Sequence, residues 1–281
     1  MCIIVLFAIH WNKELQAYLS VLALVITKGS IQSIFIARSS IVGGKDAKKD
    51  RWQWITYLLI KNDTFSFSCG GSLLTEEWVL TAAHCVDQNQ NDIKKNSYIR
   101  LGGHSLNEPS MLHRSISLIV IHPDYKKQDS ALLHDIALVK MSKKVSFSCW
   151  VKPMSLPKPR DIFRSRLKCW IAGWGAVGNN GEKTHSNTDV QTLTVPGSKA
   201  FLGFTDNMLC AGSMEGGKYF SQGDSGGPLV CRSSDKFVQV GIMSCGREGM
   251  PGVYTRVSRY VVFIQEIINS DTRLLLRPRS S

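Results

Sequence analysis

A serine placed among glycines is the most informative feature of the sequence. Ser225 lies in the segment Gly223–Pro228, which reads GDSGGP. Glycines on both sides permit a tight turn that exposes the serine Oγ and leaves backbone N–H groups bare. The N–H groups of Gly223 and Ser225 could then stabilise an oxyanion at one spot. Although a Gly-Ser-Gly sequence alone is usually only a loop, this one indicates a nucleophilic serine.

A serine hydroxyl is a poor nucleophile, so it needs a neighbouring base, and the base needs an orienting acid. His84 in Thr81–Cys85 (TAAHC) is the candidate base, and Asp135 in His134–Leu138 (HDIAL) is the candidate acid. Asp135 stands beside an apolar stretch, where a buried carboxylate requires a partner. Alone, His84 is a surface or core histidine and Asp135 a turn or cap residue. Together with the serine, they predict a nucleophile with its base and acid.

Short strands must position these residues. Apolar runs bounded by turn residues begin after Ile41 and predict strands. The expected strands are Trp54–Ile60, Trp78–Ala83, Tyr98–Leu101, Ser115–Ile121, Ile136–Met141, Leu167–Ala172, Phe237–Ser244 and Gly252–Val257. Hydrophobic residues make up 43% of the chain, which is enough to form a core. The pattern predicts an all-β fold, built as a sandwich or as barrels.

One amphipathic helix closes the predicted fold. Apolar residues at helical spacing are Tyr260, Phe263, Ile264, Ile267 and Ile268. They fall on one helical face, which predicts a helix packed on the core. Residues 271–281 are expected to form a basic, frayed tail. The proline-rich stretch Pro153–Pro159, in a connector near 148–160, is expected to join two strand-rich halves.

The charge balance favours acidic partners, but no motif supports nucleic-acid binding. The chain has 34 Lys and Arg residues against 22 Asp and Glu residues, for a net charge of +12. The basic residues are scattered, so no nucleic-acid partner is expected. No His, Cys and carboxylate cluster has zinc-ligand spacing, and the acidic residues after Gly103 are too sparse for a calcium loop. We therefore expect no metal ion and no cofactor.

The cysteines and the N-terminus indicate an oxidising compartment. Eight cysteines are widely spaced, which favours disulfides over zinc or redox motifs, although buried free thiols are the alternative. Residues 15–27 have the length of a signal-peptide core, so we expect 1–40 to be a signal and pro segment of a secreted protein. The alternative is membrane anchoring by this apolar segment, which charged residues interrupt. In a secreted chain, the sequon at Asn62 would be open to glycosylation.

The motifs resemble those of the trypsin/chymotrypsin-like serine proteases. The order His, Asp, Ser and the flanking residues match, as does Ile41–Gly44 (IVGG) at the head of the domain. Other matching segments are Cys69–Leu73, Gly173–Gly175, Asn207–Gly212 and Pro251–Thr255. The resemblance extends from Ile41 to about Ile268, so a protease-like domain is expected over 41–270. It implies two six-stranded antiparallel β-barrels with the active site between them.

The resemblance assigns roles to the catalytic residues. It implies that Ser225 is the nucleophile, His84 the general base and Asp135 the acid that orients it. The oxyanion hole would consist of the Gly223 and Ser225 N–H groups, and Ser244 would donate a hydrogen bond to Asp135. Protein or peptide substrates are implied, and protease inhibitors are possible partners.

The resemblance also implies disulfides and an activation step. The expected disulfides are Cys69–Cys85 and Cys169–Cys231. In relatives, a cut before the first residue of the IVGG motif frees an amino group, and here Ile41 would pair with Asp224 in this way. Ser40 precedes Ile41 where relatives have a basic residue. A different activator, or none, is therefore implied.

The substrate pocket departs from the family pattern. Tyr219 stands where trypsin-like enzymes have an aspartate on the pocket floor, and Phe220 follows it. An aromatic floor carries no charge for a substrate Lys or Arg, so we expect non-tryptic specificity. Further expected pocket residues are Ser244, Cys245, Gly246 and Gly252. The pocket disulfide of the family is missing, and the cysteines expected to be free or unusually paired are Cys149, Cys210 and Cys245.

These departures leave two functional classes open. One is an active serine endopeptidase with altered specificity. The other is a catalytically weak or silent homologue that acts as a secreted binding protein, whose basic surface could hold anionic glycans or proteins. A poorly folding product of alternative splicing or gene decay overlaps with the second class. The features that separate these alternatives are Tyr219, Phe220, the lost pocket disulfide and Ser40.

Overall fold

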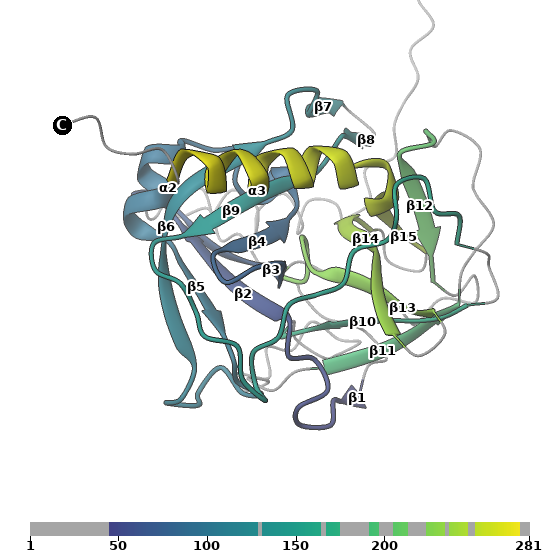
Figure 1. Ribbon diagram of the computed structural model, residues 1–281, viewed down its shortest axis with the longest axis horizontal. Helices are drawn as coiled ribbons and strands as arrows, with labels where there is room; N and C mark the ends of the chain where they lie inside the picture. Colours follow the sequence, from purple (N-terminus) through teal and green to yellow (C-terminus); the bar gives the residue numbers. More distant parts are fainter. Residues whose placement is uncertain are drawn as a thin grey trace, which may run out of the picture. The chain divides into compact units, whose positions relative to one another are not determined.

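Antiparallel strands make up most of the regular secondary structure in the described chain (Figure 1). The computed structural model describes residues 45–128, 131–163, 167–174, 191–196, 205–212, 223–233, 236–246 and 251–275. All of them belong to one unit, Arg38–Ser281. Among these residues, no helix has both the length and the apolar character needed to cross a membrane.

The earlier strands close into a six-stranded barrel in the order β2-β3-β4-β9-β6-β5. These strands are β2 (Ile55–Lys61), β3 (Ser66–Leu73), β4 (Trp78–Thr81), β5 (Tyr98–Leu101), β6 (Leu112–Ile121) and β9 (Ala137–Met141). Inward side chains such as Leu58, Ile99 and Leu138 are fully buried. Closure pairs every strand on both sides, so the barrel is a rigid support for the loops at its ends.

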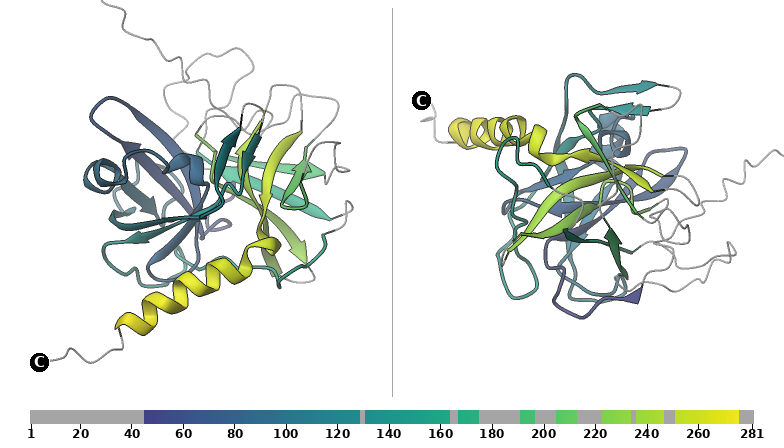
Figure 2. Two further views of the ribbon diagram at one scale, coloured as in Figure 1. Left: turned by 90° about the horizontal axis from the view of Figure 1, so that it is seen from above. Right: turned by 90° about the vertical axis from the view of Figure 1, so that its right-hand side faces the viewer.

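The later strands form a seven-stranded sheet in the order β1-β11-β10-β13-β14-β15-β12. They are β1 (Lys45–Asp46), β10 (Lys168–Gly173), β11 (Gln191–Pro196), β12 (Met208–Ala211), β13 (Pro228–Ser233), β14 (Lys236–Cys245) and β15 (Gly252–Arg256). Figure 2 shows these later strands, mostly green, on one side of the unit and the closed barrel on the other. The all-β class is confirmed. The second six-stranded barrel of the prediction takes the form of this sheet, in which β1 and β12 are the end strands among the described residues.

All eight strands predicted from the sequence lie within a few residues of observed ones. The strands that were not predicted are β1, β3, β7 (Lys126–Gln128), β8 (Ala131–Leu133), β11, β12 and β13, and the longest of them is β3. Its two glycines, Gly70 and Gly71, weaken a strand pattern. The structure shows why glycine stands there. A Cβ on Gly70 would lie 2.8 Å from the Cα of Gly227, and one on Gly71 would lie 2.7 Å from Thr56 Oγ1. These glycines therefore allow close approach of the backbone to neighbouring segments.

The helix α3 (Val261–Leu275) follows the short 3₁₀ helix η2 (Val257–Arg259) and begins with the predicted apolar face, where Ile264 is fully buried. It continues five residues into the segment expected to be a frayed tail, and this corrects the boundary at 271. Asp271 accepts hydrogen bonds from Trp78 Nε1 at 3.3 Å and from Lys140 Nζ at 2.8 Å. These polar partners on the barrel hold the last turns of the helix.

Three shorter elements complete the described fold. They are η1 (Ala83–Cys85), α2 (Gln90–Asn96) and the hairpin of β7 (Lys126–Gln128) with β8 (Ala131–Leu133). The sequence analysis does not predict α2, whose first turn is capped by the Asn89 side chain. The η1 turn and the β7–β8 hairpin both lie next to candidate active-site residues.

The connector near 148–160 contacts both halves of the unit. The backbone N–H of Met154 donates to the Leu73 carbonyl at 2.7 Å, and the N–H of Gln239 donates to the Ser155 carbonyl at 3.0 Å. A buried side-chain hydrogen bond also joins the halves, from Ser72 Oγ to Gln239 Oε1 at 2.5 Å. The two strand systems are therefore fixed to one another by buried polar contacts as well as by apolar packing.

Candidate active site

Strand register brings His84 and Asp135 together. Thr81, the last residue of β4, pairs with Ala137, the first residue of β9. His84 follows Thr81 in the η1 turn, and Asp135 precedes Ala137, so both project from the same end of the barrel. His84 Nδ1 lies 2.8 Å from Asp135 Oδ2. The pairing of two strands thus places the predicted base against the predicted acid.

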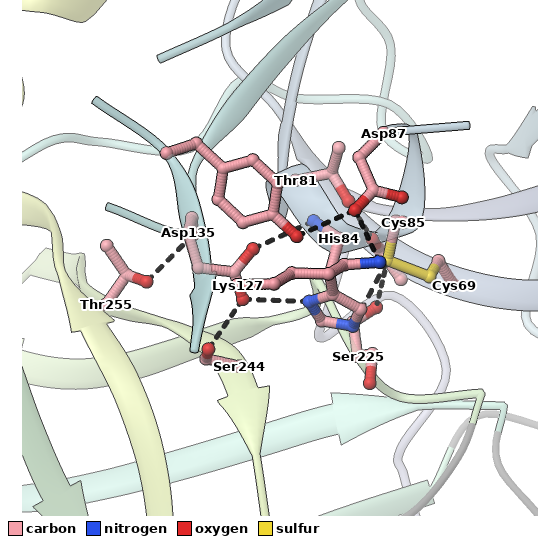
Figure 3. Close-up of polar contacts among 12 residues, drawn as sticks. Cys69, Thr81, His84, Cys85, Asp87, Lys127, Asp135, Ser225, Ser244 and Thr255 are labelled. Carbon is pink, nitrogen blue, oxygen red and sulfur yellow. Dashed lines mark hydrogen bonds and ion pairs between the residues drawn. A yellow bond between two sulfur atoms is a disulfide. The ribbon is translucent and has the colours of Figure 1, made fainter. Parts of the chain in front are cut away.

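The carboxylate of Asp135 is buried and fully engaged (Figure 3). Its Oδ1 accepts the backbone N–H of His84 at 2.9 Å. Its Oδ2 is shared by the His84 ring and by Ser244 Oγ, which donates at 2.5 Å. Burial by itself raises the pKa of this carboxyl, but the adjacent His84 and these hydrogen bonds together hold the pKa below its ordinary value. Asp135 is therefore ionised and fixed in orientation.

The loop that carries Ser225 is shaped by its main chain. Gly223 and Gly226 have φ values of 99° and 82°, in the left-handed region that favours glycine. The Ser225 carbonyl accepts the N–H of Gly70 at 2.7 Å, and the Gly226 N–H donates to the Met243 carbonyl at 2.8 Å. Strands from both halves therefore hold this turn in place.

The Ser225 loop and the His84 ring meet at a disulfide. Sγ of Cys85 lies 3.8 Å from Nε2 of His84 and 3.6 Å from the carbonyl oxygen of Ser225. Figure 3 shows Ser225 beside the imidazole, away from Asp135. Within the described residues, no hydrogen bond joins Ser225 Oγ to Nε2 of His84. Catalytic hydrogen bonds are often long in unliganded enzymes and tighten when substrate binds.

The predicted oxyanion-hole donors lie in the same turn. In the part of the chain that the structure describes, the backbone N–H groups of Gly223 and Ser225 donate to no other group, whereas those of Gly226 and Gly227 are hydrogen-bonded. If no other residue uses them, these two N–H groups could bind a substrate carbonyl oxygen beside the serine hydroxyl.

Several site residues were missed by the sequence analysis. Thr255 Oγ1 donates to the Asp135 carbonyl at 2.8 Å, which ties β15 to the segment that leads into β9. Beside His84, Asp87 pairs with Lys127 Nζ at 2.7 Å (Figure 3). Asp87 also accepts a hydrogen bond from the Tyr125 hydroxyl at 2.8 Å. Its position just after the histidine motif could have drawn attention to Asp87. Its partners could not have been predicted, because they are brought to it by the segment that forms the β7–β8 hairpin.

The structure describes only some of the residues predicted for activation, for the substrate pocket and for glycosylation. Ile41, Tyr219 and Phe220 lie outside the described residues. Asp224 and Ser244 are buried, Cys245 is half-buried, Gly246 is exposed and Gly252 is buried. Asn62 lies in the turn between β2 and β3, where its Oδ1 accepts the N–H groups of Thr64 and Phe65.

The two predicted disulfides are confirmed. Cys69 is bonded to Cys85, and Cys169 is bonded to Cys231. The first links β3 to the η1 turn that carries His84, and the second links the paired strands β10 and β13. Cys149 is an exposed free thiol. The first disulfide therefore braces the turn that carries His84, and the second braces the later sheet.

An all-β fold that brings a histidine, an aspartate and a glycine-flanked serine to one place defines a class, the serine hydrolases. Comparison with known proteins agrees with that class. The Trypsin family model matches residues 41–264. A Mus musculus protein described as "Tryptase" is 34% identical over 262 residues, covering 84% of this chain and 91% of the relative. The chain belongs to the trypsin family of serine proteases, and proteases act on proteins or peptides.

Proposed function

We propose that this chain is a secreted serine endopeptidase with non-tryptic specificity, in which Ser225, His84 and Asp135 form the catalytic triad. The observation that carries the proposal is the contact between His84 Nδ1 and the buried Asp135 carboxylate at 2.8 Å. That contact directs the other ring nitrogen of His84 away from the acid and toward the Ser225 loop. Family membership supports the reaction class.

In the acylation step, Ser225 Oγ attacks the carbonyl carbon of the scissile peptide bond. His84 Nε2 takes the hydroxyl proton, and the N–H groups of Gly223 and Ser225 bind the oxygen that becomes negative. When the C–N bond breaks, the imidazolium returns the proton to the leaving amine. The result is an acyl ester on Ser225 and a released amine.

In the deacylation step, water attacks the acyl ester and gives a proton to His84. Collapse of the second tetrahedral intermediate releases the carboxylic acid and returns the proton to Ser225. Asp135 holds one tautomer of His84 throughout and stabilises the imidazolium. Ser244 keeps the carboxylate in place, since its hydroxyl is bonded to the oxygen that faces the ring.

The specificity proposal rests on the sequence around the pocket. Tyr219 and Phe220 supply no negative charge for a Lys or Arg side chain, so substrates with small or medium apolar residues before the scissile bond should be cleaved faster. The described residues assigned to this pocket are Ser244 and Gly252, which are buried, Cys245, which is half-buried, and Gly246, which is exposed. Faster cleavage of peptides with Lys or Arg at that position would contradict this part of the proposal.

Secretion and activation complete the proposal. The two disulfides, which persist in oxidising compartments, support secretion, and Asn62 would carry a glycan. Activation would require a cut between Ser40 and Ile41, whose new amino group would meet the buried Asp224.

Labelling with a fluorophosphonate probe tests the proposal without knowledge of the substrate. The probe forms a covalent bond to an activated serine and loses fluoride. Protein engineered to begin at Ile41 should be labelled, and Ser225→Ala should abolish the label. A well-folded Ile41 protein that stays unlabelled would refute the peptidase proposal.

A second function, a silent homologue that acts as a binding protein, is favoured by two observations. No described hydrogen bond connects Ser225 Oγ with His84, and the net charge of +12 would suit anionic partners. Unlabelled, folded protein that is retained on heparin at physiological salt would support it.

A further inference from the structure

Next to Asp135, strand register assembles a second group of polar side chains that the triad does not use. Ala137 of β9 pairs with Ile121, the last residue of β6. His122 follows Ile121, and His134 lies three residues before Ala137. Two histidines twelve positions apart in the chain are therefore brought to the same end of the barrel.

The two imidazoles and one carboxylate are close enough to share a ligand. The rings of His122 and His134 are stacked, with centroids 5.1 Å apart and planes 14° apart. Nδ1 of His122 accepts the backbone N–H of Asp124 at 3.2 Å and lies 4.0 Å from its Oδ2. One ligand atom from each of His122, Asp124 and His134 lies within 4.8 Å of the others. The sequence analysis missed this cluster because its members are not at the spacing of a known zinc motif.

We propose that His122, Asp124 and His134 form a binding site for a divalent transition-metal ion of the zinc type. Two imidazole nitrogens and one carboxylate oxygen are a ligand set that zinc uses, with a fourth position left for water. Zinc–ligand bonds of about 2.0–2.1 Å place tetrahedral ligand atoms about 3.4 Å apart. The observed cluster therefore needs a contraction on the order of 1 Å to close around the ion.

The surroundings hold the two rings in position for such an ion. The Tyr260 hydroxyl lies 3.1 Å from Nδ1 of His134, and the Tyr260 ring meets His122 edge-on at 5.2 Å. Phe263 packs on His122 at 4.7 Å. Partners that orient a ligand's imidazole in this way raise metal affinity.

The backbone of His134 is also unusual. Its φ of 51° lies in the left-handed region, which is uncommon for a residue with a side chain. Such conformations persist only where the surroundings enforce them, and they cluster at functional sites. Here the conformation turns the His134 side chain toward His122 while the next residue, Asp135, faces His84.

This adjacency couples the metal site to the triad, a consequence that rests on the proposed function. Closing the ligands around an ion would move His134 and, through the shared main chain, Asp135. The Asp135 carboxylate must keep its 2.8 Å contact with His84 for His84 to act as a base. Zinc should therefore slow acylation of Ser225 rather than block substrate binding.

Calorimetric titration of the full chain with zinc chloride tests the site itself. We expect zinc to bind and Ca²⁺ and Mg²⁺, which prefer oxygen ligands, not to bind. Asp124→Asn and His122→Gln should each weaken zinc binding at least tenfold. The matched controls His113→Ala, an exposed histidine on β6, and His84→Ala should bind zinc as the unmodified chain does.

Two results would overturn the site. One is undiminished zinc affinity in both ligand variants, and the other is loss of affinity in His84→Ala, which would place the ion on the triad. Melting curves in EDTA control for folding, and Asp124→Asn changes an exposed side chain, so it remains informative if His122→Gln unfolds.

The labelling assay tests the coupling separately. Zinc should slow fluorophosphonate labelling several-fold in the otherwise unmodified enzyme and not in Asp124→Asn, each compared with its own zinc-free rate. If zinc binds but does not slow labelling, the proposed coupling to the triad is refuted, whereas the proposed metal site still stands. Absence of labelling in zinc-free protein would refute the proposed function, while the titration would still decide the metal site.

Discussion

The Asp135 region and the Ser225 loop are built in different ways although they serve one site. Asp135 is held mainly by side chains: the His84 ring, the Ser244 hydroxyl and, through its carbonyl, the Thr255 hydroxyl. Its one main-chain partner in the described part of the chain is the backbone N–H of His84. The Ser225 loop is held by its main chain, through hydrogen bonds to Gly70 and Met243.

The difference shows which changes each region tolerates. The Asp135 region depends on particular functional groups, so a substitution that keeps the shape but changes the chemistry should damage it. The Ser225 loop depends on empty space and on positive φ values, so the addition of one methyl group should damage it. The predictions below test this contrast, from the largest expected effect to the smallest.

Asp135→Asn should give the largest effect. The amide keeps the shape of the carboxylate but cannot stabilise the imidazolium, and it permits the wrong tautomer of His84. We expect labelling of Ser225 by a fluorophosphonate to slow about 10⁴-fold. Rate constants for labelling of Ile41-started proteins measure it, with circular dichroism as the folding control. A rate within about tenfold of the unmodified enzyme would break the comparison on the Asp135 side.

Gly226→Ala should give the next largest effect, on folding rather than on chemistry. A Cβ at this position would overlap Thr81 Oγ1 and would lie 2.6 Å from the Gly70 carbonyl, and φ is positive. Strain and overpacking together should lower the free energy of unfolding by about 3 kcal/mol. Urea denaturation measures the loss. Gly246→Ala, at an exposed glycine, is the matched control and should change stability little.

Ser244→Ala should have a smaller effect on both stability and rate. It removes one hydrogen bond to a buried charge, which contributes about 1.5–3 kcal/mol. Urea denaturation and labelling rates measured on the same preparation would show whether the bond acts mainly on the fold or on the triad. Stability equal to that of the unmodified chain would mean that the His84 contacts alone hold Asp135.

The smallest expected effect is a change with pH in the stability difference between Ser244→Ala and the unmodified chain. Because the folded chain lowers the pKa of Asp135 below 3.8, the unfolded chain binds the proton first as pH falls. The stabilisation is therefore complete above about pH 5 and is lost as pH falls through the folded pKa. The Ser244 bond is one cause of the lowered pKa, so the stability gap between Ser244→Ala and the unmodified chain should narrow in acid. Urea unfolding of both proteins between about pH 3 and 7 measures this difference in unfolding free energy. A difference that stays constant with pH would contradict the idea that the Ser244 hydrogen bond helps to lower the pKa of Asp135.

The sequence located the residues that meet at the candidate site better than it located the elements that support them. The motifs around His84, Asp135 and Ser225 indicated an acid, a base and a nucleophile, and the structure joins the first two directly. Alternating apolar runs predicted most strands, because a half-buried strand repeats every two residues. Glycine-rich β3 was missed, since the reason for its glycines lies in the neighbouring segments that approach it.

Contacts between distant segments could not be predicted in this way. The pairing of Asp87 with Lys127 and the meeting of His122 with His134 depend on strand register and on a hairpin. A local pattern holds no information about register between strands that are far apart in the chain. The same limit explains why the helix α3 was expected to end before Asp271, whose partners lie in β4 and β9.

The contact of Asp271 with Trp78 and Lys140 has a consequence for biosynthesis. The residue that fastens the last helix is made 193 positions after Trp78 and 131 positions after Lys140. During synthesis, the barrel strands that carry Trp78 and Lys140 therefore lack their contacts with Asp271 until the last turns of the helix have left the ribosome. A premature stop codon after residue 268 would therefore leave every residue of the proposed triad intact and still deprive the first barrel of its outer brace.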